Sequence, residues 1–231
     1  MKNIRAVLFD LDHTLWDFRA NSRETIADLY QRHHLEASGV PSLDEFILVY
    51  ERINHDMWNA YSLGTIGKEV LRKGRFANTL ERFSIHDDAL AEALASDYVR
   101  ESPLKKNLFP FVHEMLSHLQ GRYGLLMITN GFTEVQHVKV ANSGLKPYFD
   151  HIIVSEQTGF KKPHKAIFDY AASLAFTTAD RCLMVGDNLE TDIQGALAAG
   201  MQACLFDPYK EHHLMGGHTS INCLSELMVR L

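Results

Sequence analysis

The chain has 231 residues, of which 46% are hydrophobic and 23% are charged, and 23 basic against 29 acidic residues leave a net charge of −6. This length allows one large domain, or one domain with an insertion, and supplies a core without disulfides or a structural metal. The composition excludes an intrinsically disordered chain, and the mild acidity argues against binding a nucleic-acid polymer, which favours surfaces rich in Lys and Arg.

Cysteine content and hydrophobic segments indicate the compartment. Cys182, Cys204 and Cys223 are too few for a disulfide framework. No hydrophobic segment approaches the roughly 20 residues of a membrane-spanning helix, and the N-terminal residues lack the hydrophobic region of a signal peptide. We therefore expect a cytoplasmic protein in a reducing compartment, with no membrane partner.

Five short, continuously hydrophobic segments are typical of strands buried on both faces of a parallel sheet. Helical segments separate the last four of them, and this alternation predicts an α/β fold with a doubly wound parallel sheet, similar to a Rossmann-type core. The predicted strands are Ala6–Phe9, Leu125–Ile128, His151–Val154, Cys182–Val185 and Ala203–Phe206, and the helices between the last four are Glu134–Ser143, Lys165–Leu174 and Thr191–Ala199.

Roughly 110 residues separate the first two predicted strands, far more than a crossover connection requires. This interval contains amphipathic helical patterns and no strand-like segment, so we expect an α-helical domain inserted after the first strand. The predicted core comprises residues 1–17 and 104–231, and the inserted domain comprises residues 18–103. The helices predicted after the first strand are Ser22–His33, Leu43–Tyr61, Lys68–Phe83, Asp87–Val99 and, in the core, Phe109–Leu119.

Polar residues follow four of the predicted strands. In open parallel sheets, ligands bind outside the carboxyl ends of the strands, so we expect these polar side chains to share one site. In chain order they are Asp10 and Asp12, then Thr129, Asn130 and Gly131, then Lys162, and finally Asp187 and Asp192.

The acidic residues of this set suggest a metal site. Asp10 and Asp12 are two residues apart and face the same side of an extended backbone. Two such charges are unfavourable together unless a cation offsets them. With Asp187 and Asp192 they form an all-oxygen cluster, which suits Mg²⁺.

The remaining polar residues suggest an anion site beside that metal. The Thr129 hydroxyl and the backbone N–H groups of Asn130 and Gly131 are hydrogen-bond donors, and Lys162 is a cation. A phosphate fits between these donors and the metal.

This set of motifs resembles the haloacid dehalogenase superfamily of hydrolases, whose core and inserted helical cap together account for nearly the whole chain. Four motifs occur in the order and at the strand ends that the family shows. Here they are Asp10 to Thr14 (Asp-x-Asp-x-Thr), Thr129, Lys162-Pro163, and Gly186 to Asp192 (Gly-Asp-x4-Asp).

The resemblance implies a mechanism with an aspartyl-phosphate intermediate. Asp10 would be the nucleophile, and Asp12 would protonate the leaving alcohol and then deprotonate water. Mg²⁺ would be held by the Asp10 carboxylate, the Asp12 backbone carbonyl and Asp187, with Asp192 binding directly or through water. Thr129 and Lys162 would hold the transferring phosphate oxygens.

The second aspartate separates the branches of the family. Dehalogenases lack a carboxylate at the position of Asp12, so its presence implies phosphate transfer. The inserted helices resemble the helical-cap branch, and the segments Thr129–Thr133 and Met57–Tyr61 are similar to the bacterial pyrimidine 5′-nucleotidase group. The implied substrate is a nucleoside 5′-monophosphate, with pyrimidines preferred.

Aromatic residues and a histidine are candidate substrate contacts. His13 lies inside the first motif, Trp16 follows it, and Trp58 and Tyr61 lie on a predicted helix of the inserted domain. Packing is the alternative role for the three aromatic residues.

Other functions fit parts of the pattern. A sugar-phosphate or phosphoglycolate phosphatase, or a phosphoglucomutase of the same fold, would use the same chemistry on another small phosphorylated metabolite. A phospho-accepting receiver domain carries its aspartate after the third strand, whereas Asp10 follows the first. A non-catalytic binding protein has no support, because every motif position holds a competent residue. The sequence does not decide between a monomer and a dimer.

Overall fold

The computed structural model describes residues 1, 3–210 and 218–231 of the chain, which divides into two compact units. One unit comprises Met1–Phe18 and Lys106–Leu231, and the other comprises Arg19–Lys105. The described strands all belong to the first unit, and the second is helical. Two segments of the first unit, which connect it to the second, run side by side: the Asp17 N–H donates to the Asn107 carbonyl at 3.0 Å.

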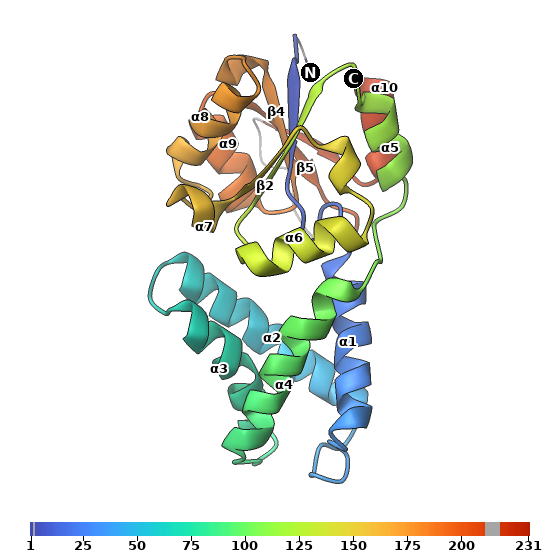
Figure 1. The fold of residues 1–231 in the computed structure, drawn as a ribbon, viewed down its shortest axis with the longest axis vertical. Coiled ribbons are helices and arrows are strands. Elements are labelled where there is room, and N and C mark those ends of the chain that lie inside the picture. Colours follow the sequence, from blue (N-terminus) through green and yellow to red (C-terminus); the bar gives the residue numbers. More distant parts are fainter. Residues whose placement is uncertain (2, 211–217) are drawn as a thin grey trace. The chain divides into compact units, whose positions relative to one another are not determined.

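The first unit is built on a parallel sheet with the strand order β3-β2-β1-β4-β5-β6 (Figure 1). Every residue of β1 and β4 is buried, as expected for strands covered on both faces. The predicted α/β fold with a doubly wound parallel sheet is therefore confirmed. The strands are β1 (Ala6–Phe9), β2 (Gly124–Thr129), β3 (His151–Val154), β4 (Cys182–Gly186), β5 (Gln202–Phe206) and β6 (Thr219–Ile221).

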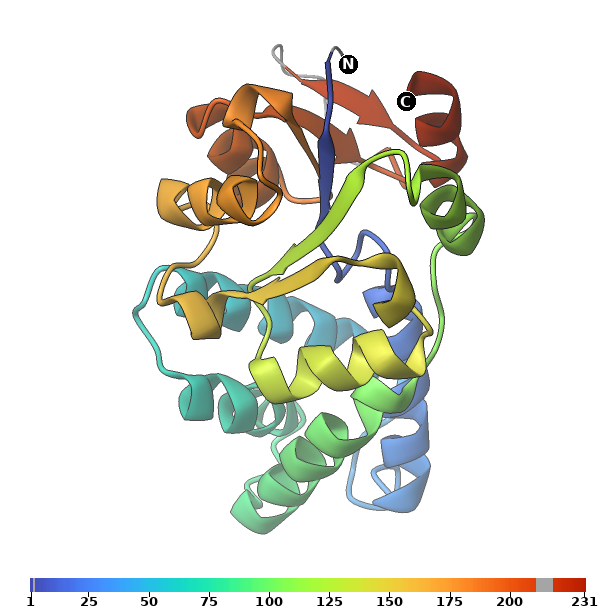
Figure 2. The same cartoon turned by 45° about the horizontal axis from the view of Figure 1, so that its top comes forward.

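Alternate side chains of each strand enter two hydrophobic cores on opposite faces of the sheet. Val7 and Phe9 of β1 pack in the core that α5, α6 and α10 cover, and Ala6 and Leu8 pack in the core under α8 and α9 (Figure 2). The helices of this unit are α5 (Val112–Leu119), α6 (Thr133–Asn142), α7 (Ser155–Thr158), α8 (Lys165–Leu174), α9 (Gly195–Ala198) and α10 (Leu227–Arg230), with short 3-10 turns at Lys146–Tyr148, Ala179–Arg181 and Leu224–Glu226.

The sheet unit differs from the prediction in several elements, among them the short helices α7 and α10, which were not predicted. The helix predicted at Thr191–Ala199 is instead a π-helical turn, η4 (Leu189–Gln194), followed by the single turn α9. The Asn188 side chain starts this turn early by accepting hydrogen bonds from two backbone N–H groups, those of Glu190 and Thr191. The strand β6 was not predicted, because its three residues form no hydrophobic run.

The helical unit has its own core. Two of its helices begin at capping side chains: Ser42 accepts from the Glu45 N–H at 3.2 Å, and Asp87 accepts from the Leu90 N–H at 2.9 Å. An aromatic cluster of Tyr50, Phe76 and Tyr98, with ring centroids 5.0 to 5.7 Å apart, packs between three of the helices. The helices are α1 (Phe18–Arg32), α2 (Leu43–Ser62), α3 (Lys68–Glu81) and α4 (Asp88–Glu101), and the 3-10 turn Ser102–Leu104 follows.

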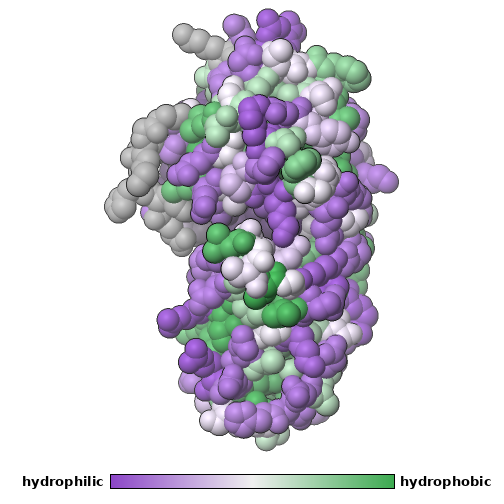
Figure 3. All heavy atoms as spheres, turned by 90° about the vertical axis from the view of Figure 1, so that its left-hand side faces the viewer, coloured by the Kyte–Doolittle hydropathy of each residue, from purple (hydrophilic) through white to green (hydrophobic). Residues whose placement is uncertain are grey.

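None of the helices in the described part of the chain combines the length and the apolar character needed to span a bilayer. On the face drawn in Figure 3, hydrophobic side chains form small groups separated by hydrophilic ones, which is ordinary for the surface of a folded domain.

Two phenylalanines near α8 provide a matched test of core packing. Phe168 is fully buried in the core under α8, whereas Phe176, just after the helix, is 95% exposed. We expect Phe168→Ala to lower the free energy of unfolding by about 3–5 kcal/mol through lost burial and a cavity. The control Phe176→Ala should change it by less than about 0.5 kcal/mol. Urea denaturation followed by circular dichroism measures both, and equal effects would contradict this packing.

Candidate active site

The candidate site lies where the strand order of the sheet reverses, between β1 and β4. Phe9 is paired with Val185 in register, and the Asp10 N–H continues the ladder by donating to the Val185 carbonyl at 2.9 Å. Asp10 and Asp187 therefore leave neighbouring parallel strands at the same edge. Ligands bind at such a switch point because the flanking loops separate there.

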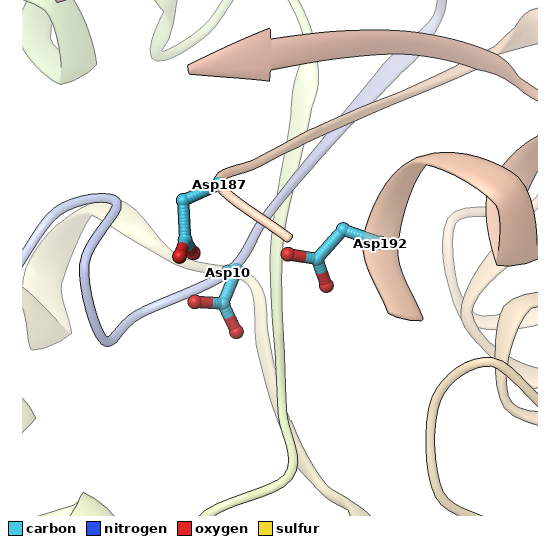
Figure 4. Close-up of side chains that lie close together, drawn as sticks. All are labelled: Asp10, Asp187 and Asp192. Atoms are coloured by element: carbon cyan, nitrogen blue, oxygen red, sulfur yellow. The ribbon is translucent and has the colours of Figure 1, made fainter. Parts of the chain in front are cut away.

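Three carboxylates converge at this edge. Asp10, Asp187 and Asp192 each offer an oxygen, and these atoms lie within 4.8 Å of one another (Figure 4). The Lys162 ammonium lies 2.5 Å from Asp10 Oδ1 and 2.6 Å from Asp192 Oδ1. The Thr14 hydroxyl donates to Asp187 Oδ1 at 3.1 Å. The structure thus brings together three of the four predicted acidic residues and the predicted lysine.

The π-helical turn η4 places Asp192 in this cluster. Asp192 is 1% exposed, and its Oδ2 accepts the Asn188 N–H at 3.2 Å, which ties the side chain to the end of β4. A Cβ atom at Gly186 would lie 2.3 Å from that same oxygen, so glycine is required for the close approach. Insertions of π-helix often re-aim a side chain at a functional site.

The backbone of Lys162 is held by Asn130. The Asn130 amide donates to the Lys162 carbonyl and accepts from the Lys162 N–H, each at 2.9 Å. This double hydrogen bond joins the loop after β2 to the loop that carries the lysine. Asn130 therefore positions the cation, in addition to lying beside the predicted phosphate donors.

Burial makes uncompensated charge in the carboxylate cluster energetically unfavourable. Burial raises the pKa of Asp10 to about 7, against the pull of Lys162, and burial together with the neighbouring charges of Asp10 and Asp192 raises the pKa of Asp187 well above its usual range. The two carboxylates beside Lys162 raise the pKa of that lysine despite its burial, so it stays charged. One cation facing three carboxylates leaves a local excess of negative charge. Because all the ligand atoms are oxygens, the cluster fits a hard divalent cation such as Mg²⁺.

Asp12 lies in a separate electrostatic environment, with partners that the sequence analysis did not identify. Lys139 Nζ lies 2.5 Å from Asp12 Oδ1, and Gln136 Nε2 donates to Asp12 Oδ2 at 2.7 Å. Burial raises the pKa of Asp12, but the Lys139 cation and the hydrogen bonds from Lys139 and Gln136 outweigh it, so the pKa lies below its usual value.

The predicted phosphate-binding hydroxyl has both of its lone pairs engaged. Thr129 Oγ1 accepts the Gly131 N–H at 3.1 Å and a Gln136 amide hydrogen at 2.6 Å. A hydroxyl carries two lone pairs and one hydrogen. What Thr129 has left to offer a ligand is therefore its O–H, which is the group an anion requires. The Gly131 N–H donates to Thr129 Oγ1, so in this arrangement its hydrogen bond goes to the hydroxyl and not to a phosphate.

Two candidate contacts lie close to the first motif. His13 is exposed and has a left-handed backbone with φ of 66°, and its ring lies 4.7 Å from the Phe18 ring. Trp16 has no exposed surface, and the Lys139 ammonium lies 4.1 Å from its ring centroid. This geometry makes Trp16 a packing partner of Lys139, with no ring surface open to solvent.

The other two candidate contacts belong to the helical unit. Trp58 is partly exposed on α2, and Tyr61 is 8% exposed. Their rings meet edge to face at 5.6 Å and 88°, an arrangement that aromatic pairs favour.

The sequence pattern around Gln136 and Lys139 indicates that both side chains are buried. They occupy positions i and i+3 of α6, and Val140 at i+4 lies on the same buried face. Polar residues on the hydrophobic face of a helix that directly follows the threonine motif indicate buried partners. The pattern does not reveal which group they meet, because that depends on how α6 packs against the ends of β1 and β2.

Comparisons with known proteins identify the family of the chain. A family model of the haloacid dehalogenase-like hydrolases matches residues 4–200. The pyrimidine 5′-nucleotidase YjjG of Escherichia coli is 34% identical over 200 residues, covering 86% of this chain and 84% of that protein, and the pyrimidine 5′-nucleotidase PynA of Streptococcus pneumoniae is 32% identical over 210 residues, covering 90% and 84%.

A solved structure supports the same conclusion. The HAD-hydrolase YfnB of Bacillus subtilis is 31% identical over 210 residues, covering 90% of this chain and 86% of that protein. Its crystal structure bound to magnesium matches with a TM-score of 0.88 over 99% of each chain at 29% identity. The sequence motifs, the fold and these relatives agree, and the chain belongs to the haloacid dehalogenase-like hydrolases.

Proposed function

We propose that this hydrolase is a Mg²⁺-dependent phosphomonoesterase that acts on nucleoside 5′-monophosphates, with pyrimidine nucleotides preferred. The observation that carries the proposal is the pairing of two aspartates with different surroundings on one loop. Asp10 belongs to the three-carboxylate cluster, and Asp12 is held apart by Lys139. Two carboxyl groups in different environments suit a nucleophile and an acid–base group.

The first half-reaction transfers the phosphoryl group to the protein. The Asp10 carboxylate forms a bond to phosphorus, the bond between phosphorus and the ester oxygen breaks, and that oxygen takes a proton from Asp12. An incoming phosphate dianion raises the pKa of Asp12, because a nearby like charge disfavours the ionised form. Thr129 donates its hydroxyl hydrogen and Lys162 its charge to the phosphate oxygens.

The second half-reaction restores the protein. Water attacks the phosphorus of the aspartyl phosphate, Asp12 takes a proton from that water, and the release of inorganic phosphate regenerates Asp10. The Asp10 and Asp187 carboxylates and the Asp12 backbone carbonyl would hold Mg²⁺, with Asp192 binding directly or through water. The cation supplies the positive charge that lets an anionic nucleophile approach an anionic phosphate.

The nucleotide assignment is supported by the relatives. The two most informative are pyrimidine 5′-nucleotidases, and each aligns with more than four fifths of this chain. We assign the choice of substrate to the helical unit, with Trp58 and Tyr61 as contacts and His13 as a further contact from the first motif.

A cytoplasmic setting is supported by the cysteines. All three are free, and burial raises the pKa of Cys182 to about 11 and that of Cys204 to about 12. Such buried thiols behave as inert core side chains.

Removal of the nucleophile tests the chemistry. We expect the wild-type protein to release phosphate from uridine 5′-monophosphate with Mg²⁺, and Asp10→Asn to lower kcat at least about 10³-fold because asparagine cannot form the acyl phosphate. The matched control is Asp169→Asn, which removes a half-exposed carboxylate paired with Lys165 and should leave kcat unchanged. Turnover that survives both chelation and Asp10→Asn would refute the mechanism.

A substrate panel tests the specificity. Nucleoside 5′-monophosphates, sugar phosphates and phosphoglycolate are compared by phosphate release, and pyrimidine nucleotides should give the highest kcat/KM. Activity confined to sugar phosphates or phosphoglycolate would remove the nucleotide assignment and leave the chemistry in place.

Trp58 offers a test of base recognition. Stacking of a base on an aromatic ring is worth about 1–3 kcal/mol, so Trp58→Leu should raise KM for uridine 5′-monophosphate at least about fivefold. Ribose 5-phosphate, which lacks the base, serves as the control substrate, and its KM should not change. Equal losses on both substrates would assign Trp58 a packing role.

The raised pKa of Asp10 predicts a pH dependence of stability in the metal-free protein. The folded pKa of about 7 lies above the unfolded value of 3.8, so the stability from this carboxyl is fully present below pH 3.8 and is lost as the pH rises through about 7. With a chelator present, the free energy of unfolding of the wild-type protein should therefore fall between pH 4 and 8 relative to that of Asp10→Asn.

Addition of Mg²⁺ at pH 8 should reverse this loss in the wild-type protein, because the cation binds the ionised carboxylate. Urea denaturation at several pH values, with and without Mg²⁺, measures both effects. A difference between the two proteins that does not vary with pH would contradict the raised pKa.

A further inference from the structure

Two buried polar residues of α6 have no part in either half-reaction. Gln136 is fully buried, and Lys139 is 4% exposed. Burial of a lysine is costly unless an opposite charge lies close to it. The residue that meets this requirement is Asp12, whose Oδ1 lies 2.5 Å from Lys139 Nζ.

Gln136 links two groups of the site. One amide hydrogen goes to Asp12 Oδ2 at 2.7 Å and the other to Thr129 Oγ1 at 2.6 Å. An amide nitrogen has two hydrogens, so both are used. The acid–base carboxylate and the phosphate-binding hydroxyl are therefore held at a fixed separation by one side chain.

The surroundings leave both side chains little freedom. A Cβ atom at Gly131 would lie 2.1 Å from Gln136 Nε2, so the glutamine amide rests directly on the backbone of the threonine motif. The Lys139 ammonium lies 4.1 Å from the Trp16 ring centroid and 5.4 Å from that of Phe18, within the range of a cation–π contact. Gln136 and Lys139 are three residues apart on one helix and so move as a unit.

We infer that Gln136 and Lys139 are positioning residues for Asp12. Lys139 and Gln136 each hold one carboxylate oxygen, which fixes the plane of the group, and Gln136 sets its distance from the phosphate held at Thr129. Precise placement of this kind matters because proton transfer requires hydrogen-bond distance in the transition state. The inference rests on the proposed phosphomonoesterase activity.

The predicted signature is a dependence on the leaving group. When the bond between phosphorus and the ester oxygen breaks, phenyl phosphate loses a phenolate that benefits from a proton, whereas p-nitrophenyl phosphate loses an anion that departs without one. The two esters differ by a nitro group, so they separate proton donation from substrate fit. The kcat/KM value reports this step, because it covers the reaction up to the release of the first product.

Lys139→Met and Gln136→Met test the inference. We expect each variant to lower kcat/KM for phenyl phosphate and for uridine 5′-monophosphate at least about tenfold, a part of the 10²–10⁴-fold that general acid catalysis contributes. The value for p-nitrophenyl phosphate should change less than about threefold, as should the affinity for Mg²⁺ measured by titration calorimetry. The matched control is Lys165→Met, which breaks an exposed lysine–aspartate pair. It should leave kcat/KM for all three substrates unchanged.

A double-mutant cycle provides the second measurement. If Lys139 acts through Asp12, Lys139→Met should cause little further loss in an Asp12→Asn background, whereas an independent structural role would give multiplied losses. Thermal melts by circular dichroism show whether each variant is folded. If Lys139→Met does not fold, the inference is tested with Gln136→Met alone.

Equal losses on both aryl esters, or multiplied losses in the cycle, would overturn the inference. Absence of phosphate release from every ester by the wild-type protein would instead overturn the proposed function, so the two failures are distinguishable.

Discussion

Lys162 lies 2.5 Å from Asp10 and 2.6 Å from Asp192, and the arrangement around the sheet edge follows from this ion pair. Three carboxylates at 4.8 Å or less, two of them buried, repel one another strongly in a medium of low polarity. One lysine offsets part of that repulsion, provided that its position is fixed. Asn130 fixes it with two hydrogen bonds to the Lys162 backbone. The remaining excess of negative charge makes the same cluster suitable for a divalent cation.

A second cation divides the site into two electrostatic regions. Burial raises the pKa of Asp10, while Lys139 and Gln136 lower that of Asp12. Without ligands, the protein therefore favours the protonated form of Asp10 and the ionised form of Asp12 relative to free carboxyl groups, whereas phosphoryl transfer requires the reverse. Under the proposed function, a bound cation favours the ionised form of Asp10 and a bound phosphate favours the protonated form of Asp12. The ligands themselves would then prepare the two aspartates for the reaction.

The helical unit depends on local signals in the sequence, namely hydrophobic periodicity and helix capping. Ser42 and Asp87 begin two of its helices by accepting backbone N–H groups, and Tyr50, Phe76 and Tyr98 fill its core. These signals act within one or two helical turns, which explains why α2 begins at the predicted residue. The start of α1 at Phe18 lies four residues before the predicted start at Ser22.

Local patterns in the sequence determined the parallel sheet and the residues at its edge, because continuous hydrophobic runs form buried strands and polar residues directly follow them. Asp10, Thr129 and Asp187 could be predicted for that reason, and Lys162 lies in the loop that leads on from β3. Only the tertiary structure decided what these groups contact. The π-helical turn brings Asp192 back to the end of β4, and the packing of α6 delivers Lys139 and Gln136 to Asp12. The contacts of Asp12 with α6 join residues more than 100 positions apart, and a one-dimensional pattern carries no information about how two distant segments are oriented when they pack.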